Sequence, residues 1–230
     1  MEILPNGYTL ELAEGCFPLS TDSMVLGHFA ALPKNAAVLD LGSGCGTLGL
    51  LLCAGDPNCR VTGIELSEAA HCRALENISR NGLAHRMASI CADLRTVPQL
   101  FSPGAFSVCI SNPPYFSGGP ASKNTPVARR EDHCSLKELI HSAAWALKYG
   151  GDFYIVHRPE RLADIIARAG EENLEAKRLL LVRHRPESDI SIIALQLRKG
   201  GRPGLKIEEA TLFDTKGEPT PFYHNVYHLP

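Results

Sequence analysis

The sequence of 230 residues predicts an α/β fold in which an open, largely parallel β-sheet is covered by helices. Short apolar segments typical of buried strands alternate with helical segments from about residue 38 to residue 169. A glycine turn, Gly42-Ser43-Gly44-Cys45-Gly46, joins the first of these strands to the following helix. Strand, glycine turn and helix in this order are typical of a nucleotide-binding loop at the edge of such a sheet.

The expected elements extend this plan in chain order. The alternating residues 8–12 and the segment up to Phe17 indicate a short hairpin, and Ser20 or Thr21 can cap a helix over residues 22–31. Strands are expected at 38–41, 60–66, 88–92, 106–111 and 153–157, and helices at 47–54, 67–82, 135–149 and 159–169, with Gly150-Gly151 ending the helix that starts at 135.

In the last third of the chain, the alternation of strands and helices gives way to two adjacent strands. Residues 176–185 and 190–198 are expected to form two long strands of an antiparallel hairpin, with the turn at Pro186-Glu187-Ser188-Asp189. At this length we expect one domain, with residues 1–36 as an N-terminal extension and residues 37–230 as its core.

Charge is unevenly distributed along the chain, although the net charge is only −2. Residues 1–122 contain 6 Lys and Arg against 10 Asp and Glu, whereas residues 123–206 contain 16 against 11. A near-neutral protein with such a basic segment can present one basic face to an anionic polymer, as nucleic-acid-binding proteins do.

The cysteines and the chain start indicate a reducing compartment. None of the eight cysteines forms a Cys-x-x-Cys pair, so we expect reduced thiols and no metal site. The first residues lack the basic and apolar regions of a secretory signal, and no apolar segment approaches the ~20 residues that span a bilayer. We therefore expect a cytoplasmic protein without membrane contact.

Three carboxylates follow three consecutive expected strands. Asp40 ends the first strand, Glu65 the second and Asp93 the third. Ligands of open α/β sheets bind beyond the carboxyl ends of the strands, so the three side chains are expected around one ligand. Glu65 lies 19 residues after Gly46, where a carboxylate can accept hydrogen bonds from both hydroxyls of a ribose.

The fourth strand ends in a second informative motif, Asn112-Pro113-Pro114-Tyr115. Two prolines fix the backbone and remove two N–H donors, which leaves the Asn112 side-chain oxygen and the Pro113 carbonyl as acceptors. Together they can hold both hydrogens of a planar amino group, while a base stacks on Tyr115 for roughly 1–3 kcal/mol. The motif predicts chemistry on an exocyclic amine.

Both motifs resemble those of known enzymes. The Asp-x-Gly-x-Gly-x-Gly pattern at residues 40–46 is similar to motif I of class I S-adenosylmethionine-dependent methyltransferases, and Asn-Pro-Pro-Tyr is similar to motif IV of their amino-group-modifying members. Residues 17–26 and 128–131 resemble the bacterial tRNA(Val) adenine-N6 methyltransferases, which modify the adenosine beside the anticodon. The resemblance implies a Rossmann-like, seven-stranded sheet with a terminal antiparallel hairpin and a short N-terminal extension.

This resemblance assigns expected roles to individual residues. Asp93 would contact the adenine amino group of the cofactor S-adenosyl-L-methionine, and Thr21 and Asp22 would lie near it. The expected cofactor-binding residues are Thr21, Asp22, Asp40, Gly42, Ser43, Gly44, Cys45, Gly46, Glu65, Leu66, Asp93, Leu94 and Asn112. The expected catalytic residues are Asn112, Pro113, Pro114 and Tyr115.

A tRNA is the expected partner, and no metal is implied. Arg198-Lys199-Gly200-Gly201-Arg202 is expected to be a flexible basic tip on the terminal hairpin that can bind phosphates. Residues after motif IV can reach RNA beside the flipped base. The expected RNA-binding residues are Tyr115, Lys123, Arg129, Arg130, Arg198, Lys199 and Arg202.

Three alternatives to tRNA methylation stay open. Glutamine methylation of a release factor uses the same motif IV, but such enzymes usually carry an N-terminal helical domain that 36 residues cannot form. DNA adenine methylation usually needs a target-recognition domain. The third alternative is a non-catalytic RNA-binding protein with this fold, against which the complete motifs argue. Thr47 stands where a nicotinamide-dinucleotide fingerprint has its third glycine, which excludes a dehydrogenase.

Overall fold

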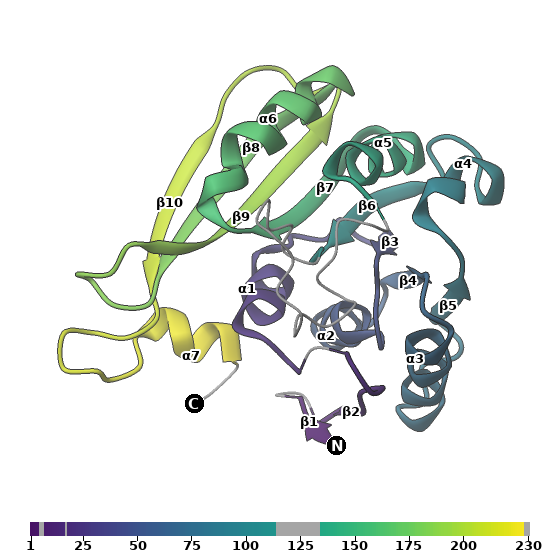
Figure 1. Ribbon diagram of the computed structural model, residues 1–230, viewed down its shortest axis with the longest axis horizontal. Helices are drawn as coiled ribbons and strands as arrows, with labels where there is room; N and C mark the ends of the chain where they lie inside the picture. Colours follow the sequence, from purple (N-terminus) through teal and green to yellow (C-terminus); the bar gives the residue numbers. More distant parts are fainter. Residues whose placement is uncertain (5–6, 17, 114–133, 228–230) are drawn as a thin grey trace.

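The computed structural model describes residues 1–4, 7–16, 18–113 and 134–227 (Figure 1). An eight-stranded sheet runs through the molecule in the order β10-β8-β9-β7-β6-β3-β4-β5. Its strands are β3 (Ala37–Leu41), β4 (Arg60–Glu65), β5 (Met87–Cys91), β6 (Phe106–Ser111), β7 (Leu147–His157), β8 (Leu174–Arg183), β9 (Ile190–Lys199) and β10 (Lys206–Thr211). Within the described sheet, β9 alone is antiparallel to its neighbours, so the carboxyl ends of the other seven strands meet at one edge.

Helices cover both faces of this sheet (Figure 1). One face carries α1 (Thr21–Phe29), α2 (Thr47–Gly55), α3 (Glu68–Arg80) and α7 (Pro221–Tyr227); the other carries α4 (Val97–Leu100), α5 (Leu136–Ala146) and α6 (Leu162–Glu171). Two short 3₁₀ helices, η1 (Leu94–Thr96) and η3 (Pro159–Arg161), follow β5 and β7. No helix in the described parts is long and apolar enough to cross a membrane.

Burial on both faces explains the nearly continuous apolar strands of the sequence. Successive residues of a strand point to opposite faces, so Val38 packs with α1 and α2 while Leu39 packs with α5. Both side chains are fully buried, and Phe153 and Tyr154 of β7 divide between the two layers in the same way. The described cysteines are free thiols, several of them buried as small apolar side chains.

Side-chain caps fix where the main helices begin. Ser20 accepts a hydrogen bond from Ser23 N at the start of α1, and Ser67 does the same for α3. Ser135 and Glu138 form a reciprocal capping box at the start of α5. These polar groups satisfy amides that would otherwise lack a partner, and they place the amino ends of α1 and α3 at the carboxyl edge of the sheet.

The fold-class prediction is confirmed, with one strand more than expected. β10 pairs in parallel with β8 and forms the outer edge of the sheet, where Arg178 and Glu208 make an ion pair. Three of the six residues of Lys206–Thr211 are charged and none is buried, so the segment lacks the apolar signal of a buried strand. An edge strand held by a neighbour's backbone and by ion pairs does not need that signal.

Two expected boundaries are wrong. The predicted helix over 135–149 ends at Ala146, and β7 starts directly at Leu147. Gly150 and Gly151 lie inside β7, where the register with β6 shifts and Gly150 takes a φ of +78°. The glycines therefore mark an irregular strand rather than a helix end.

The N-terminal hairpin has a different partner from the one expected. β2 (Thr9–Leu10) pairs antiparallel with β1 (Glu2–Ile3), which precedes it, and not with the segment that follows. The residues after β2 instead run across the carboxyl edge of the sheet toward α1 (Figure 1). Phe17 lies outside the described residues.

Candidate active site

A cavity of about 1060 Å³ opens at the carboxyl edge of the sheet. Its lining comes from the ends of β3, β4, β5 and β6, from the segment before α1 and from the loop after β7. The lining contains Asp22, Gly42, Ser43, Gly44, Cys45, Glu65, Leu66, Asp93, Leu94, Asn112 and Pro113 of the predicted site. Gly46 and Asp40 are not among the lining residues, and neither is Thr21.

The glycine turn takes a backbone that only glycine adopts without strain. Gly42, Gly44 and Gly46 have φ values of +74°, +55° and +88°. The amides of Gly42 and Ser43 both donate to the carbonyl of Ile64 on β4, at 2.9 and 3.0 Å. The turn is therefore fixed to the neighbouring strand, and its backbone faces the cavity at the start of α2.

Glu65 joins this turn to the next helix. One carboxylate oxygen accepts from Gly44 N at 2.8 Å, and the other accepts from Ser67 N at 2.8 Å. Each carboxylate oxygen has further acceptor capacity. The carboxylate is therefore held in one orientation at the cavity wall, and the predicted bidentate contact with a ribose stays compatible with it.

Asp40 lies behind the turn rather than in the cavity. Its side chain is only 1% exposed, and neither carboxylate oxygen has a hydrogen-bond partner in the described structure. Burial, with a smaller effect of the Glu65 charge, raises the pKa of Asp40 to about 8. The carboxyl is thus protonated at neutral pH, and it supports the floor of the site instead of presenting a charge to a ligand.

Asp93 stands at the end of β5 and caps η1. Its carboxylate accepts hydrogen bonds from the backbone N–H of Arg95 at 2.9 Å and from the guanidinium of the same residue. This pairing fixes the carboxylate on the cavity rim beside Leu94. The predicted contact with an adenine amino group stays a prediction.

The amide of Asn112 is oriented by a residue that the sequence did not indicate. Its Nδ2 donates to Ser23 Oγ of α1 at 2.9 Å, and Ser23 is 7% exposed. Within the described residues no donor is paired with Oδ1, and both Asn112 and Pro113 line the cavity. Nδ2 is therefore engaged, and Oδ1 is the amide atom available to a ligand. Pro114, Tyr115, Lys123, Arg129 and Arg130 lie outside the described residues.

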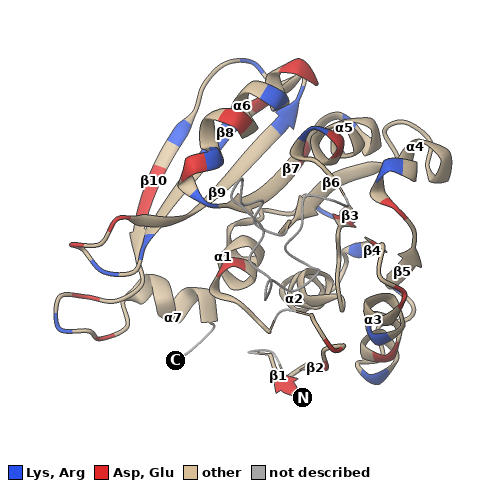
Figure 2. Ribbon diagram, in the orientation of Figure 1, with Lys and Arg blue, Asp and Glu red and all other residues tan. Residues whose placement is uncertain are grey.

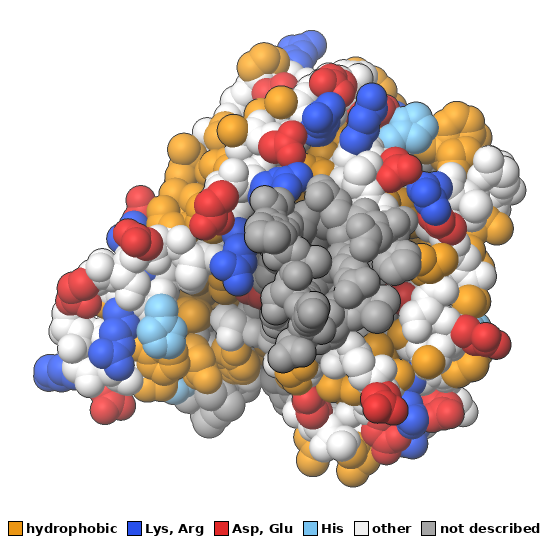
Figure 3. Space-filling model, viewed as in Figure 1, with side chains coloured by type: hydrophobic (Ala, Val, Ile, Leu, Met, Phe, Trp, Pro, Cys, Tyr) orange, Lys and Arg blue, Asp and Glu red, His pale blue; other side chains and the backbone are white. Residues whose placement is uncertain are grey.

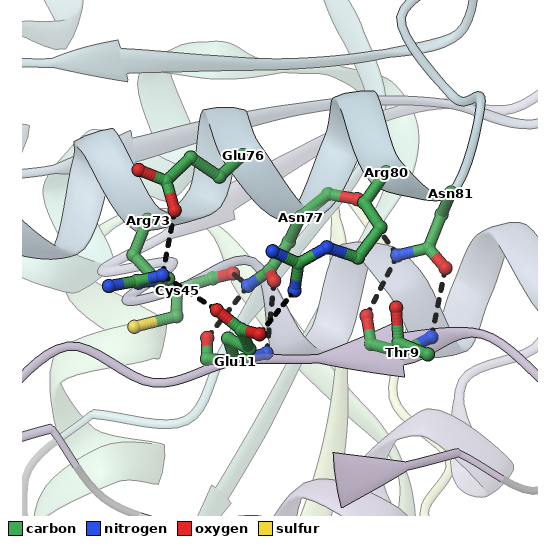
Figure 4. A network of polar contacts seen from close by, with 8 residues as sticks. All are labelled: Thr9, Glu11, Cys45, Arg73, Glu76, Asn77, Arg80 and Asn81. Carbon is green, nitrogen blue, oxygen red and sulfur yellow. Dashed lines mark hydrogen bonds and ion pairs between the residues drawn. The ribbon is translucent and has the colours of Figure 1, made fainter. Parts of the chain in front are cut away.

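The N-terminal segment completes the wall of the cavity and is anchored by α3 (Figure 4). Asn77 accepts from Glu11 N at 2.9 Å and donates to Glu11 O at 2.8 Å and to Cys45 O at 2.9 Å. One turn later, Asn81 accepts from Thr9 N and donates to Thr9 O, both at 2.8 Å. The two amides pair with the segment as a neighbouring strand would, and Asn77 also contacts the glycine turn.

Ion pairs reinforce this anchor. Glu11 lies between Arg73 and Arg80 of α3, with N···O distances of 2.8 and 2.7 Å (Figure 4). The hydrogen bond from Arg80 and the two arginine charges lower the pKa of Glu11. Beyond it the chain continues as residues 12–20, most of which line the cavity: Leu12, Glu14, Gly15, Cys16, Pro18, Leu19 and Ser20.

Polar residues at the end of β7 and directly after it form the opposite wall. The residues that line the cavity here are His157, Arg158, Glu160 and Arg161, none of which belongs to the predicted site. Burial lowers the pKa of His157 to about 4, and its Nδ1 accepts from Arg158 N at 2.8 Å. His157 is therefore neutral at physiological pH. The sequence signal that could have indicated these four residues is their position at or just beyond the carboxyl end of the strand expected at 153–157.

Part of the predicted RNA contact surface lies elsewhere. Arg198 pairs with Asp152 of β7 at 2.8 and 2.9 Å, and Lys199 donates to two carbonyls at the end of α5, at 2.6 and 2.8 Å. Because β9 is antiparallel, Arg198 and Lys199 lie at the edge opposite the cavity, and Figure 2 shows basic residues at this end of β9. The Arg202 carbonyl lies near the same edge, since it accepts from Lys177 in the first half of β8 at 2.8 Å. The expectation of a flexible tip on the hairpin is wrong for Arg198 and Lys199, since both side chains are tied to the sheet and the hairpin turn lies at 184–189.

Fold and site together define a class I, Rossmann-like methyltransferase that uses S-adenosylmethionine as methyl donor. Residues 21–169 match the model of the methyltransferase small domain, and the chain belongs to this family. The matched region contains the glycine turn, the strand-end carboxylates and Asn112.

Similar proteins agree with this assignment. A tRNA1(Val) (adenine(37)-N6)-methyltransferase of Bacteroides thetaiotaomicron is 33% identical over 73% of this chain and 71% of its own. A protein of the same name from Shewanella sp. is 28% identical over 87% of this chain and 86% of its own. A predicted O-methyltransferase of Agrobacterium tumefaciens has the same fold, with a TM-score of 0.76 at 22% identity over 90% of this chain and 96% of its own.

Proposed function

We propose that this enzyme transfers the methyl group of S-adenosylmethionine to the N6 amine of an adenine in tRNA. Relatives named as tRNA1(Val) (adenine(37)-N6)-methyltransferases support the adenosine beside the anticodon of tRNA(Val) as the target. The orientation of Asn112 carries the proposal: with Nδ2 held by Ser23, the side-chain oxygen is the atom left for the amine of a substrate.

The lining of the cavity fits the cofactor. The glycine-turn backbone would let the cofactor approach closely, the Glu65 carboxylate at the cavity wall would accept hydrogen bonds from the ribose hydroxyls, and Asp93 with Leu94 at the rim would contact the adenine. A geranyl diphosphate C-methyltransferase of Streptomyces coelicolor, solved with Mg²⁺, geranyl diphosphate and S-adenosyl-L-homocysteine, shares the fold at a TM-score of 0.59 over 77% of this chain and 79% of its own. When bound, S-adenosylmethionine supplies a methyl group on a positively charged sulfur.

The residues of the chain then act mainly by position. The lone pair of the exocyclic N6 nitrogen of adenine is delocalised into the ring, so this amine is a poor nucleophile. Acceptors at Asn112 Oδ1 and the Pro113 carbonyl hold its two hydrogens and favour a lone pair directed at the methyl group. Tyr115 would stack on the base. No strong base is required, because the amine becomes acidic once it is methylated.

The experiment is methyl transfer from labelled cofactor into tRNA that lacks modifications, followed by nucleoside analysis. We expect N6-methyladenosine with the wild-type protein and at least a roughly 100-fold lower rate with Asn112→Ala, since pre-oriented polar groups contribute on that order. His85→Ala, an exposed change far from the cavity, is the control and retains full activity.

Other substrates give distinct outcomes. Label in a glutamine-containing peptide of a release factor, with none in RNA, would show protein methylation. Label in DNA alone would show DNA adenine methylation. Tight cofactor binding without transfer to any of the three would leave the non-catalytic alternative.

A further inference from the structure

A second cavity of about 420 Å³ adjoins the active-site cavity. Three residues, Asp22, Arg158 and Glu160, line both cavities, so the two are neighbours at the same edge of the sheet. The remaining lining residues are Thr21, Pro159, His184, Ile190, Ser191, Ile192 and Leu212. The lining thus combines aliphatic side chains, hydroxyls, a histidine, one arginine and two carboxylates; the histidine can stack on a base, the carboxylates can accept from ribose hydroxyls, and the arginine can contact a phosphate.

Aromatic side chains extend this cavity along the surface. The His184 ring lies 4.9 Å from Phe213, Phe213 lies 5.0 Å from Tyr223, and Tyr223 stacks on Tyr227 at 4.4 Å, all measured between ring centroids. Tyr227 in turn makes a 3.0 Å hydrogen bond with Thr21 of the lining. The four rings are half-buried or exposed. The space-filling view shows a histidine and hydrophobic side chains above α7, with basic and acidic side chains around them (Figure 3).

Arginine side chains lie at this side of the active site. Arg158 lines both cavities, Arg161 lines the active-site cavity, and Arg185 is exposed next to His184 in the chain. Two carboxylates, Asp22 and Glu160, line both cavities together with Arg158. A phosphate that passes between the cavities would therefore contact an arginine side chain and would not be held by an overall positive charge.

We propose that the second cavity binds the nucleotide adjacent to the target adenosine in the RNA strand, with its base stacked on His184. This proposal rests on the proposed function, since it requires an RNA substrate whose target base enters the active site. Neighbouring nucleotides of a strand are joined by one phosphate, and the residues shared by the two cavities, among them Arg158, lie at the junction where that phosphate would pass.

The test combines changes in the RNA with changes in the protein. The full-length protein is titrated with a hairpin taken from the tRNA that it methylates, and with two hairpins that carry an abasic ribose directly 5′ or directly 3′ of the target. For the wild type, loss of one of the two neighbouring bases should weaken binding roughly 10-fold, as expected for one base–aromatic stack.

For His184→Ala, the intact hairpin should bind roughly 10-fold more weakly, and the abasic change should have no further effect. Ser191→Tyr places a large ring in the second cavity and excludes the neighbouring base. It should therefore also bind the intact hairpin more weakly than the wild type and show no further loss with the abasic hairpin. His85→Ala should behave as the wild type, and calorimetric titration with S-adenosylmethionine should give wild-type affinity for all variants, which shows that each is folded.

Equal abasic effects in the wild type, His184→Ala and Ser191→Tyr would overturn the second-cavity proposal while RNA methylation stands. No binding and no methylation of any RNA by the wild type would overturn both this proposal and the proposed function.

Discussion

The contact between Ser23 and Asn112 joins a helix residue to motif IV across 89 positions of the chain. Ser23→Ala removes the acceptor of Nδ2 and lets the amide rotate, so we expect the methylation rate to fall about 5-fold, in line with the ~1 kcal/mol of one hydrogen bond. The affinity for S-adenosylmethionine should not change. Single-turnover rates and calorimetry separate the two quantities.

The control for this change is Ser23→Thr, which keeps the hydroxyl and should restore most of the rate. A rate that falls equally in both variants would show that helix packing, and not the hydrogen bond, sets the effect.

Asp40 makes a pH-dependent contribution to stability. Its folded-state pKa of about 8 exceeds the ordinary value of 3.8, so the unfolded chain loses this proton well before the folded protein does. Stability of the wild type therefore decreases between about pH 4 and pH 8, by up to ~1.4 kcal/mol per pH unit. The asparagine of Asp40→Asn does not titrate. The unfolding free energy of this variant minus that of the wild type should therefore rise as the pH increases from about 4 to about 8, and stay constant above pH 8.

Urea unfolding of the cofactor-free proteins at pH 5, 6.5, 8 and 9.5 measures this difference. His157 also titrates, with a folded pKa of about 4, and its stabilising effect is lost as the pH falls below about 6.5; because both proteins contain it, it cancels in the comparison. A difference that is constant with pH would contradict the buried, protonated carboxyl.

Residues of the site were predictable where they belong to a local sequence motif next to an expected strand. Gly44, Glu65 and Asn112 follow strands at recognisable spacings, and the structure places all three at one cavity. Ser23 and Asn77 were not predictable, because a serine in an apolar helix or an asparagine in a polar one has no local signature. Their partners lie 89, 66 and 32 positions away, and only the folded chain brings them together.

At the scale of elements, α3 acts as the anchor of the N-terminal segment. Asn77→Ala removes the bonds to Glu11 and to the Cys45 carbonyl, so both the cavity wall and the glycine turn lose support. We expect the affinity for S-adenosylmethionine to fall about 10-fold, equivalent to ~1.4 kcal/mol. Calorimetric titration measures it, and Asn77→Asp, which places a carboxylate oxygen against the carbonyls of Glu11 and Cys45 in a fully buried site, should lose at least as much affinity.

Asn81→Ala is the matched control one helical turn away. It releases Thr9 but does not touch the glycine turn, so it should lower stability without changing cofactor affinity. Equal losses of affinity in the two alanine variants would contradict a specific role of Asn77.

The elements themselves were predictable to different degrees for physical reasons. Buried strands such as β6 were found with their observed bounds, since burial on both faces requires an apolar run. β10 was missed because its edge position tolerates charged residues. The junction between α5 and β7 was misplaced because Gly150-Gly151, a common helix end, serves here as a strand irregularity next to Ser107.

At the scale of the whole molecule, basic residues lie at two opposite edges of the sheet. We expect those at one edge to contribute to stability and those at the other to contribute to RNA affinity. Arg198 lies at the edge opposite the cavity and pairs with the largely buried Asp152, while Arg185 is exposed near the second cavity. Arg198→Met leaves that carboxylate without its partner, which costs on the order of 1–2 kcal/mol and lowers Tm by roughly 2–8 °C for a chain of this size. Arg185→Met should leave Tm unchanged.

Affinity for RNA should respond in the opposite way. Arg185→Met removes one cation near the path of the strand, so the slope of log K against log salt should become less steep by up to about one unit. Arg198→Met should bind the hairpin with the wild-type slope at any temperature where it is folded. Thermal unfolding and salt titrations of both variants thus decide which edge of the sheet meets RNA, and a reduced slope in Arg198→Met would place the RNA on the edge that the cavity does not occupy.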